Sequence, residues 1–328
     1  MSGTRQLSAL LPLGLWAAVV IGAAVYGTWH GYGGRAFAVT LGVLAFLLAS
    51  QLLLASGNLG EQLARRAGSH GGVLLAIVPF LAYLIYVFGT NAFTWRRVAI
   101  AAAYTLTPVL LVLLRVESKP GAWTDYLAML AIFLPLKLRW LNVLWPYPVA
   151  EMGYVATMLL AINVALAAFL FVRRLDGMGY SIVWGRDIAL AIGLNFGLLA
   201  AILVPLGTAL HFIRFDPSGA HWRSLPADSI GIFLLTAWPE EFLFRGLLQN
   251  SLSRTLRSEQ GGWLTASVVF GLAHIGNNGV FPNWKYALLA TIAGIFYGRT
   301  WRTTKSIFPS AIVHALVDTI WHLLFRTI

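Results

Sequence analysis

Long apolar stretches recur along almost the whole chain, and they constrain its fold more than any other feature. A helix needs about 20 consecutive apolar residues to cross the hydrocarbon core of a bilayer. Hydrophobic residues make up 59% of the 328 residues and charged residues only 11%, whereas soluble domains carry about 25% charged residues. We therefore predict an all-α fold, a polytopic transmembrane helical bundle of about 10–11 helices. The candidate spans are residues 7–27, 36–56, 72–90, 98–114, 124–141, 150–172, 187–213, 228–250, 263–276, 285–299 and 306–326.

The formal net charge of +11 raises the question of nucleic-acid binding. The lysines and arginines are scattered in short loops between apolar stretches, and neither a glycine-rich loop nor a basic helix organises them. Basic residues at loop ends are typical of integral membrane proteins. We expect the lipid bilayer to be a partner of this chain and expect no nucleic acid to bind.

Polar residues are distributed unevenly among the spans. The interiors of the first four spans contain almost no ionisable residue, whereas the polar groups inside spans concentrate after residue 187. A polar connector at residues 175–186 separates the two regions. We predict two parts: residues 1–174, N-terminal transmembrane helices of unknown role, and residues 175–328, which carry the chemistry.

Two adjacent carboxylates, Glu240 and Glu241, lie near the middle of an apolar stretch. A charge at the centre of a bilayer costs on the order of 3 kcal/mol or more. Glu241 and Arg245 are four residues apart, so they share a helix face and can form an ion pair. Glu240 points elsewhere and is left free. Pro239 removes a helical hydrogen bond directly before the acids, and we expect it to kink the helix and open room for water.

Two later spans also carry polar side chains. His274 lies in the ninth span, and His314, Asp318 and His322 form one stripe of the last span because they are spaced by four residues. Polar groups inside membrane spans face the interior of the bundle and pair with one another. We therefore expect these side chains to meet the two glutamates in one site.

A carboxylate combined with imidazoles favours hydrolysis by activated water. The chain has no cysteine, which excludes a thiol nucleophile, a disulfide and a cysteine-ligated metal. A general base that takes a proton from water fits the residues that are present.

Zinc-dependent hydrolysis is the competing interpretation. Glu240, His274 and His314 are the residue types that bind zinc in many peptidases. The helical His-Glu-x-x-His motif is absent, so we favour no metal and no cofactor. A transporter or a non-catalytic scaffold is a further alternative, although the apolar early spans offer no polar path for a transporter.

The late spans carry three motifs in order: Glu240-Glu241-xxx-Arg245, Phe270-xxx-His274 and His314-xxx-Asp318. With the Phe-Arg-Gly segment at residues 244–246, they resemble the CAAX-protease and bacteriocin-processing (CPBP) family. That family includes the type II prenyl-protein endopeptidases and the bacterial Abi-type membrane proteins. The resemblance covers residues 187–328.

The resemblance implies an intramembrane endopeptidase, a hydrolase of the glutamic peptidase type, with residues 175–328 as its protease core. It implies that Glu240 is the base that activates water and that Glu241 and Arg245 order the site. It also implies that His274 binds or positions that water.

The same resemblance implies that His314 and Asp318 stabilise the oxyanion of the intermediate. Asp318 stands where the eukaryotic prenyl-protein enzymes have asparagine, and an ionised aspartate cannot donate a hydrogen bond. An oxyanion role therefore needs a protonated Asp318 or works through the orientation of His314. Bacterial members of the family tolerate aspartate at this position.

The substrate implied by the resemblance is a membrane-associated peptide or protein. Many bacterial members act where no prenylated protein exists, so prenyl-CAAX cleavage is not the default expectation. The bacterial relatives also lead us to expect a multi-pass protein of a bacterial cytoplasmic membrane.

Overall fold

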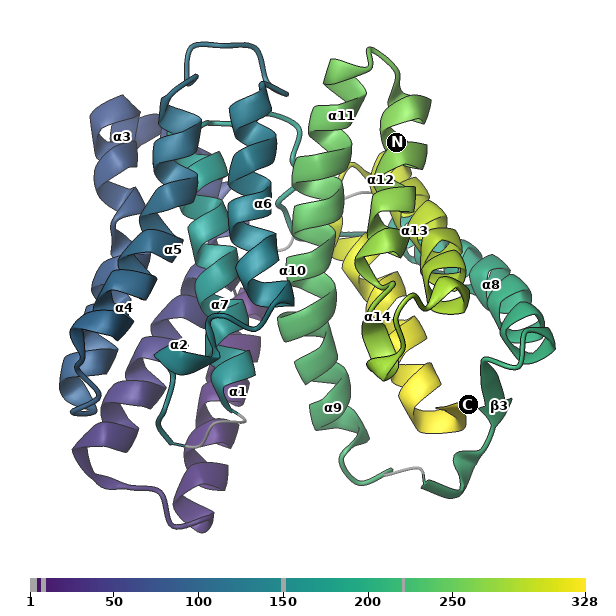
Figure 1. Ribbon diagram of the computed structural model, residues 1–328, viewed down its shortest axis with the longest axis horizontal. Helices are drawn as coiled ribbons and strands as arrows, with labels where there is room; N and C mark the ends of the chain where they lie inside the picture. Colours follow the sequence, from purple (N-terminus) through teal and green to yellow (C-terminus); the bar gives the residue numbers. More distant parts are fainter. Residues whose placement is uncertain (1–4, 7–9, 149–151, 220–221) are drawn as a thin grey trace. The chain divides into compact units, whose positions relative to one another are not determined.

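The computed structural model describes residues 5–6, 10–148, 152–219 and 222–328. Most of these residues are helical (Figure 1), so the predicted all-α fold is confirmed. Seven helical segments of the described residues are long and apolar enough to cross a membrane, and the protein is an integral, multi-pass membrane protein. They are Leu10–Trp29, Gly34–Leu54, Leu59–Gly89, Trp95–Leu113, Met152–Val172, Arg186–Ala209 and Ile307–Leu324.

Each of the eleven predicted spans contains a helix, although residues 7–9 and 150–151 of two spans lie outside the described residues. Further helix precedes the third predicted span: Leu59–Gly89 forms a helical segment of 31 residues that is interrupted by the non-helical Gly68 (φ 65°). Its first turns are polar and carry an exposed ion pair of 3.6 Å between Arg65 and Glu61. An apolar stretch marks only the part of a helix that suits lipid, so it does not reveal a polar extension.

The chain forms two compact units, Gln6–Asp176 and Gly177–Ile328, the second of which also includes Arg5. The short strand β1 spans Arg5–Gln6. The helices of the first unit are α1 (Leu10–Trp29), α2 (Gly34–Leu54), α3 (Leu59–Ala76), α4 (Val78–Gly89), α5 (Trp95–Leu113), α6 (Trp123–Lys137), η1 (Asn142–Leu144), α7 (Met152–Leu166) and η2 (Ala167–Val172).

The helix formed by α7 and η2 is the centre of the first unit. In an apolar stretch of 18 residues of this helix, 94% of the residues are buried. Helices α2, α4, α5 and α6 pack on α7, and α3 and α5 pack on η2. A helix that is apolar on all sides needs such complete enclosure. Directly after it, the buried Arg173 places Nε 2.7 Å from Oδ1 of Asp125 and donates to three backbone carbonyls. This ion pair is fully hydrogen-bonded and has a structural role.

The elements of the second unit carry every residue that the sequence marks for chemistry. They are β2 (Val183–Trp184), α8 (Arg186–Ala209), β3 (Ile213–Phe215), η3 (Pro217–Gly219), α9 (Leu225–Ile232), η4 (Phe233–Ala237), α10 (Trp238–Glu241), η5 (Phe242–Gln249), α11 (Asn250–Thr255), α12 (Glu259–Ala273), η6 (Asn277–Gly279), α13 (Trp284–Thr304), α14 (Ile307–Leu324) and β4 (Phe325–Thr327).

Helix α14 lies at the centre of the second unit and contacts α8, α9, α10, η4 and α13, while α12 packs against α13 and η5. The close approach of α12 and α13 depends on Gly271, where an added Cβ would overlap the hydroxyl of Thr291 and the carbonyl of Ala287. Small residues at helix contacts are how membrane helices pack tightly. This packing brings the three motif-bearing helical segments together.

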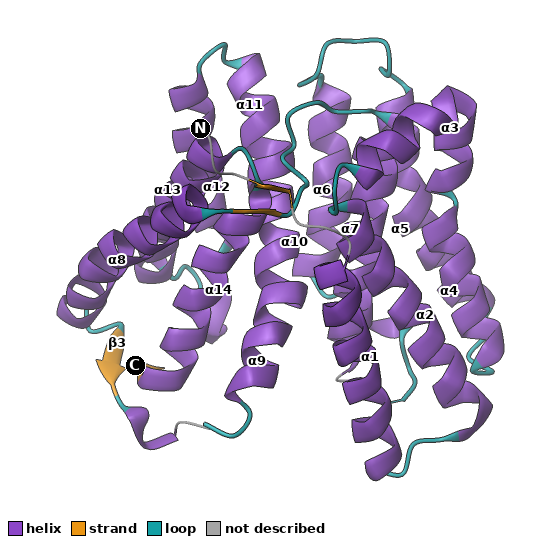
Figure 2. Ribbon diagram, turned by 180° about the vertical axis from the view of Figure 1, so that it is seen from behind, coloured by secondary structure: helices purple, strands orange, loops and turns teal. Residues whose placement is uncertain are grey.

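The chain end closes one side of this unit. Strand β3 pairs antiparallel with β4, with Ile213 opposite Thr327, and Figure 2 shows β3 beside the C-terminus. Two arginines flank the carboxylate of Asp216, with Arg326 Nε at 3.2 Å and Arg214 Nη2 at 3.4 Å. This short sheet joins the end of α8 to the end of α14.

Candidate active site

The two glutamates lie on a helix that is wound differently on either side of them. α10 holds Glu240 and Glu241, and it is flanked by the π-helical stretches η4 and η5. The amide of Trp238 donates to the carbonyl of Phe233, five residues earlier. Pro239 has no amide hydrogen to contribute to a regular ladder. Where a kink was predicted at Pro239, the structure has π-helical turns on both sides of α10, and such turns are frequent at functional sites.

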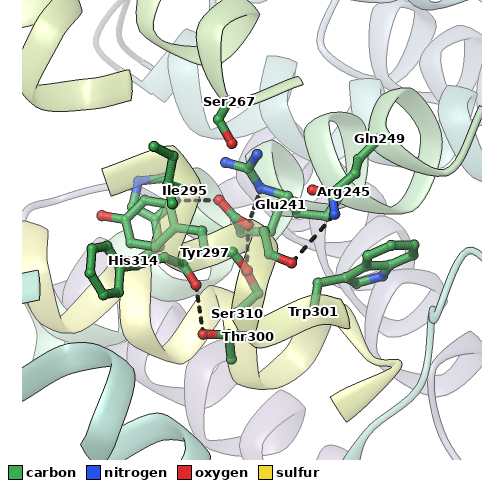
Figure 3. A network of polar contacts seen from close by, with 12 residues as sticks. Glu241, Arg245, Gln249, Ser267, Ile295, Tyr297, Thr300, Trp301, Ser310 and His314 are labelled. Atoms are coloured by element: carbon green, nitrogen blue, oxygen red, sulfur yellow. Dashed lines mark hydrogen bonds and ion pairs between the residues drawn. The ribbon is translucent and has the colours of Figure 1, made fainter. Parts of the chain in front are cut away.

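Glu241 is the anchor of a buried polar network (Figure 3). Its Oε2 receives hydrogen bonds from Arg245 Nε at 2.9 Å and from Ser310 Oγ at 2.5 Å. Its Oε1 lies 3.1 Å from Nδ1 of His314. The side chains of Glu241 and Arg245 are fully buried, so the pairing expected from their four-residue spacing is present.

The Arg245 guanidinium is bonded on one edge and covered by rings. Only Nε reaches Glu241, and Nη1 and Nη2 have no hydrogen-bond partner among the described residues. The guanidinium carbon lies 5.0 Å from the ring centre of Phe270 and 6.0 Å from that of Tyr297. Cation–π contacts of this kind stabilise a desolvated cation. Arg245 therefore holds Glu241 in one orientation and does not reach toward a substrate.

His314 is held between two carboxylates. Its Nδ1 faces Glu241, and its Nε2 lies 3.5 Å from Oδ2 of Asp318. The ring stacks on Tyr297 with centroids 4.6 Å apart and an interplanar angle of 14°. Because a carboxylate only accepts hydrogen bonds, the nitrogen facing Glu241 is a donor. To donate to an oxyanion, as the family resemblance implies, His314 would have to release one of these carboxylates.

Glu240 is placed quite differently from its neighbour. It lines a cavity of about 1030 Å³ together with His274, His314 and Asp318. Its Oε2 is buried and has no hydrogen-bond partner among the described residues. The groups whose charge acts on this carboxylate include both histidines, Asp318 and Glu241. Glu240 is therefore the unengaged acid of the pair, and it lies among the other predicted residues.

His274, at the end of α12, presents one nitrogen to the cavity. Its Nδ1 lies 2.8 Å from the carbonyl oxygen of Phe270. A carbonyl can only accept, so Nδ1 carries the hydrogen and Nε2 of the neutral ring is an acceptor. The ring packs 4.7 Å from that of Phe270 and 5.3 Å from that of Tyr286. These contacts fix both the tautomer and the orientation of His274.

The three polar residues predicted to share one face of the last span also line the cavity: His314, Asp318 and His322. His322 is exposed, and its Nδ1 donates to the backbone carbonyl of Asp318 at 2.7 Å. The expected grouping of these side chains with Glu240 and His274 is present.

Sequence reasoning missed Ser310 and Tyr297. Ser310 lies one helical turn before His314 and shares its face, so the four-residue spacing was the signal that could have identified it. Tyr297 lies on α13, where no polar motif marks it among the surrounding apolar residues. Both complete the network around Glu241 and His314.

The alternative metal set does not gather around a common point. Among the described residues, no group of three or more His, Asp or Glu side chains is placed to hold one metal ion. The predicted ligand set was Glu240, His274 and His314. Both ring nitrogens of His314 face other carboxylates, those of Glu241 and Asp318. The donor set that the residues offer thus does not fit a three-ligand zinc site in this geometry.

Comparison with protein families identifies the region that carries the site. Residues 222–320 match the family model described as type II CAAX prenyl endopeptidase Rce1-like. The predicted relationship to the CPBP and CAAX-protease family is confirmed, and the chain is a hydrolase of the peptidase class. No curated protein and no solved structure matches the chain.

Proposed function

We propose that this protein is an intramembrane endopeptidase in which Glu240 activates the water that cleaves a peptide bond. One observation carries the proposal: Glu240 lines the cavity and its Oε2 has no hydrogen-bond partner among the described residues, while Glu241 beside it is bonded on both oxygens. A buried acceptor without a donor is a binding site for water in a roomy polar cavity. A carboxylate held there can serve as a general base.

The reaction then follows from the geometry. Glu240 accepts a proton from water while the water oxygen attacks the carbonyl carbon of the peptide bond. The resulting tetrahedral intermediate collapses when the C–N bond breaks and Glu240 returns the proton to the leaving nitrogen. The products are a carboxylic acid and an amine, and the base is restored; the acid then loses its proton to solvent.

His274 orients the water in this proposal. Its Nδ1 is fixed on the carbonyl of Phe270, so its Nε2 accepts the second hydrogen of a water held by Glu240. Two acceptors aimed at one water place an oxygen lone pair toward the substrate. Holding the water in this way lowers the activation barrier, because the attack becomes in effect a unimolecular step.

Five further side chains hold the site in a fixed geometry: Glu241, Arg245, Ser310, His314 and Asp318. Glu241 links the helix of the base to α14 through Ser310 and His314. We assign Asp318 the task of holding Nε2 of His314, which its 3.5 Å separation supports. Support of this kind matters because catalytic groups must be held within a fraction of an ångström.

The substrate that suits this site is a membrane-associated peptide or protein, because α14, which carries His314 and Asp318, is long and apolar enough to cross a membrane. We propose hydrolysis without a bound metal, in the cytoplasmic membrane of a bacterium. Elemental analysis of the purified protein, with activity measured in a strong chelator, tests the metal. Stoichiometric zinc that is lost together with activity would refute the metal-free mechanism.

The base is tested with Glu240→Gln in proteoliposomes that contain a library of membrane-anchored peptides. Mass spectrometry of new peptide termini measures cleavage. We expect a loss of about 100-fold to 10,000-fold, the usual contribution of a general base. The matched control is Glu259→Gln, an exposed carboxylate of the same unit that has only long contacts of 3.7 and 4.0 Å to basic side chains. Normal cleavage by the Glu240→Gln variant would refute the assignment.

A further inference from the structure

The oxyanion of the proposed reaction needs a hydrogen-bond donor that the sequence motifs do not supply. Donors aimed at the developing oxyanion are among the largest contributions to hydrolysis. Asp318 as a carboxylate only accepts, and both nitrogens of His314 face carboxylates. The hydroxyl hydrogen of Ser310 is directed at Glu241 or at the carbonyl of Tyr297.

Tyr297 offers the missing donor. Its side chain is 1% exposed and lines the cavity. Its backbone carbonyl accepts from Ser310, but its hydroxyl makes no hydrogen bond to another described residue. The hydroxyl oxygen keeps some accessible surface, because it is not among the buried side-chain atoms without a partner in the described residues.

The ring of Tyr297 packs against other residues that line the same cavity. The phenol ring lies flat on the ring of His314, as Figure 3 shows, and its centroid is 5.9 Å from that of Phe270. The charges that act on the hydroxyl are the carboxylates of Asp318, Glu241 and Glu240 and the guanidinium of Arg245. A buried donor in a cavity wall, with no partner among the described residues, is available to a ligand oxygen.

We propose that the hydroxyl of Tyr297 donates a hydrogen bond to the carbonyl oxygen of the scissile peptide bond and to the oxyanion that forms from it. This inference rests on the hydrolysis proposed above. No proton is transferred, since the hydroxyl keeps its hydrogen throughout. The negative charge develops on the carbonyl oxygen when water attacks and disappears when the C–N bond breaks.

The other tyrosine of the cavity is less suited to this task. The hydroxyl of Tyr286 is engaged by Asn277, and its ring stacks on Trp321 with centroids 5.9 Å apart. Tyr286 therefore contacts the site through the face of its ring against His274. The stacking on His314 is specific to Tyr297.

Tyr297→Phe tests the proposal because it keeps the ring and its stacking and removes only the hydroxyl. We expect kcat to fall about 100-fold to 1,000-fold, with KM changed by no more than about twofold, since the bond strengthens only in the transition state. The matched control is Tyr104→Phe in the first unit, a buried tyrosine whose hydroxyl donates to the carbonyl of Ile132 at 3.3 Å. That variant should keep its kcat.

Two outcomes separate this inference from the proposed function. If Tyr297→Phe cleaves at the normal rate while Glu240→Gln is inactive, the oxyanion role is overturned and the hydrolysis stands. If Glu240→Gln also cleaves normally, the proposed function itself fails.

A second measurement covers the case in which Tyr297→Phe does not fold. Replacement of Tyr297 by 3,5-difluorotyrosine keeps the hydroxyl but makes it more acidic. A more acidic hydroxyl donates a stronger hydrogen bond to an oxyanion, so kcat measured at one neutral pH should rise above the wild-type value. An unchanged kcat would overturn the proposal, because a purely structural ring has no reason to respond.

Discussion

The Nδ1 nitrogen of His314 lies 3.1 Å from Oε1 of Glu241, and this contact joins α14 to α10 through two residues that are 73 positions apart in the chain. It explains why the two adjacent glutamates differ. Glu241 is bonded on both oxygens by Arg245, Ser310 and His314, which leaves Glu240 as the acid that faces the cavity. The division of roles between neighbouring carboxylates is thus produced by tertiary packing.

Breaking the Glu241–Arg245 pair should destabilise the second unit strongly. Arg245→Met leaves a fully buried carboxylate without its main counter-charge, and removal of one partner of a buried pair costs about 3–5 kcal/mol. Denaturant unfolding in detergent micelles measures this cost.

The double variant Glu241→Gln with Arg245→Met provides the control for that experiment. Because both charges are then absent, we expect it to be less destabilised than the sum of the two single variants. Strict additivity would show that the two side chains do not interact.

Ser310→Ala should lower stability and activity moderately. It removes the hydroxyl that bonds Oε2 of Glu241, and a hydrogen bond to a charged group contributes about 1.5–3 kcal/mol. The carboxylate keeps Arg245 and His314, so the site is weakened and not abolished. Thermal unfolding together with kcat measures both effects, and a variant with wild-type values of both would contradict the role of Ser310.

Gly271→Ala should disrupt the contact between α12 and α13. The added Cβ would overlap Thr291 Oγ1 and the backbone carbonyl of Ala287, so the helices must move apart and His274 moves with α12. The matched control is Gly193→Ala on α8, where no atom lies within 4 Å of the added Cβ. We expect a large loss of thermal stability for the first variant and none for the second. Equal effects of the two substitutions would contradict the packing described.

Features that depend on residues close together in the sequence could be predicted from the sequence. The apolar stretches predicted a helix in every span, because bilayer thickness fixes the length that must be apolar. The pairing of Glu241 with Arg245 followed from helical spacing alone. Both are local properties of the chain.

Tertiary contacts were not accessible in the same way. The contact between Glu241 and His314, the stacking of Tyr297 on His314 and the orientation of His274 depend on how α10, α12, α13 and α14 pack. The π-helical turns around Pro239 have no sequence signal beyond the proline itself. The polar start of α3 was missed because hydropathy reports lipid contact and not helicity.

The short sheet at the C-terminus should depend on pH. The hydroxyl of Ser218, followed by Arg326 and Arg214, lowers the pKa of Asp216 below its usual value. A carboxyl whose pKa is lower in the folded state stabilises the fold above its unfolded pKa, and this contribution is lost as the pH falls through the folded pKa. Hydrogen exchange of β3 and β4, corrected for intrinsic rates, should therefore accelerate on acidification.

Asp216→Asn is the control for this pH dependence. The amide cannot titrate, so exchange in β3 and β4 should lose its dependence on acidic pH. Acceleration of the same size in the variant would assign the effect to another group.

The central claim is that Glu240 acts on water and not directly on the substrate. A single turnover in water labelled with oxygen-18 tests this most directly, with mass spectrometry of both the product and the peptide of the enzyme that contains Glu240. We predict one labelled oxygen in the new carboxyl group of the product and none in the side chain of Glu240. Label in the Glu240 carboxyl group, or a product without label, would contradict the mechanism.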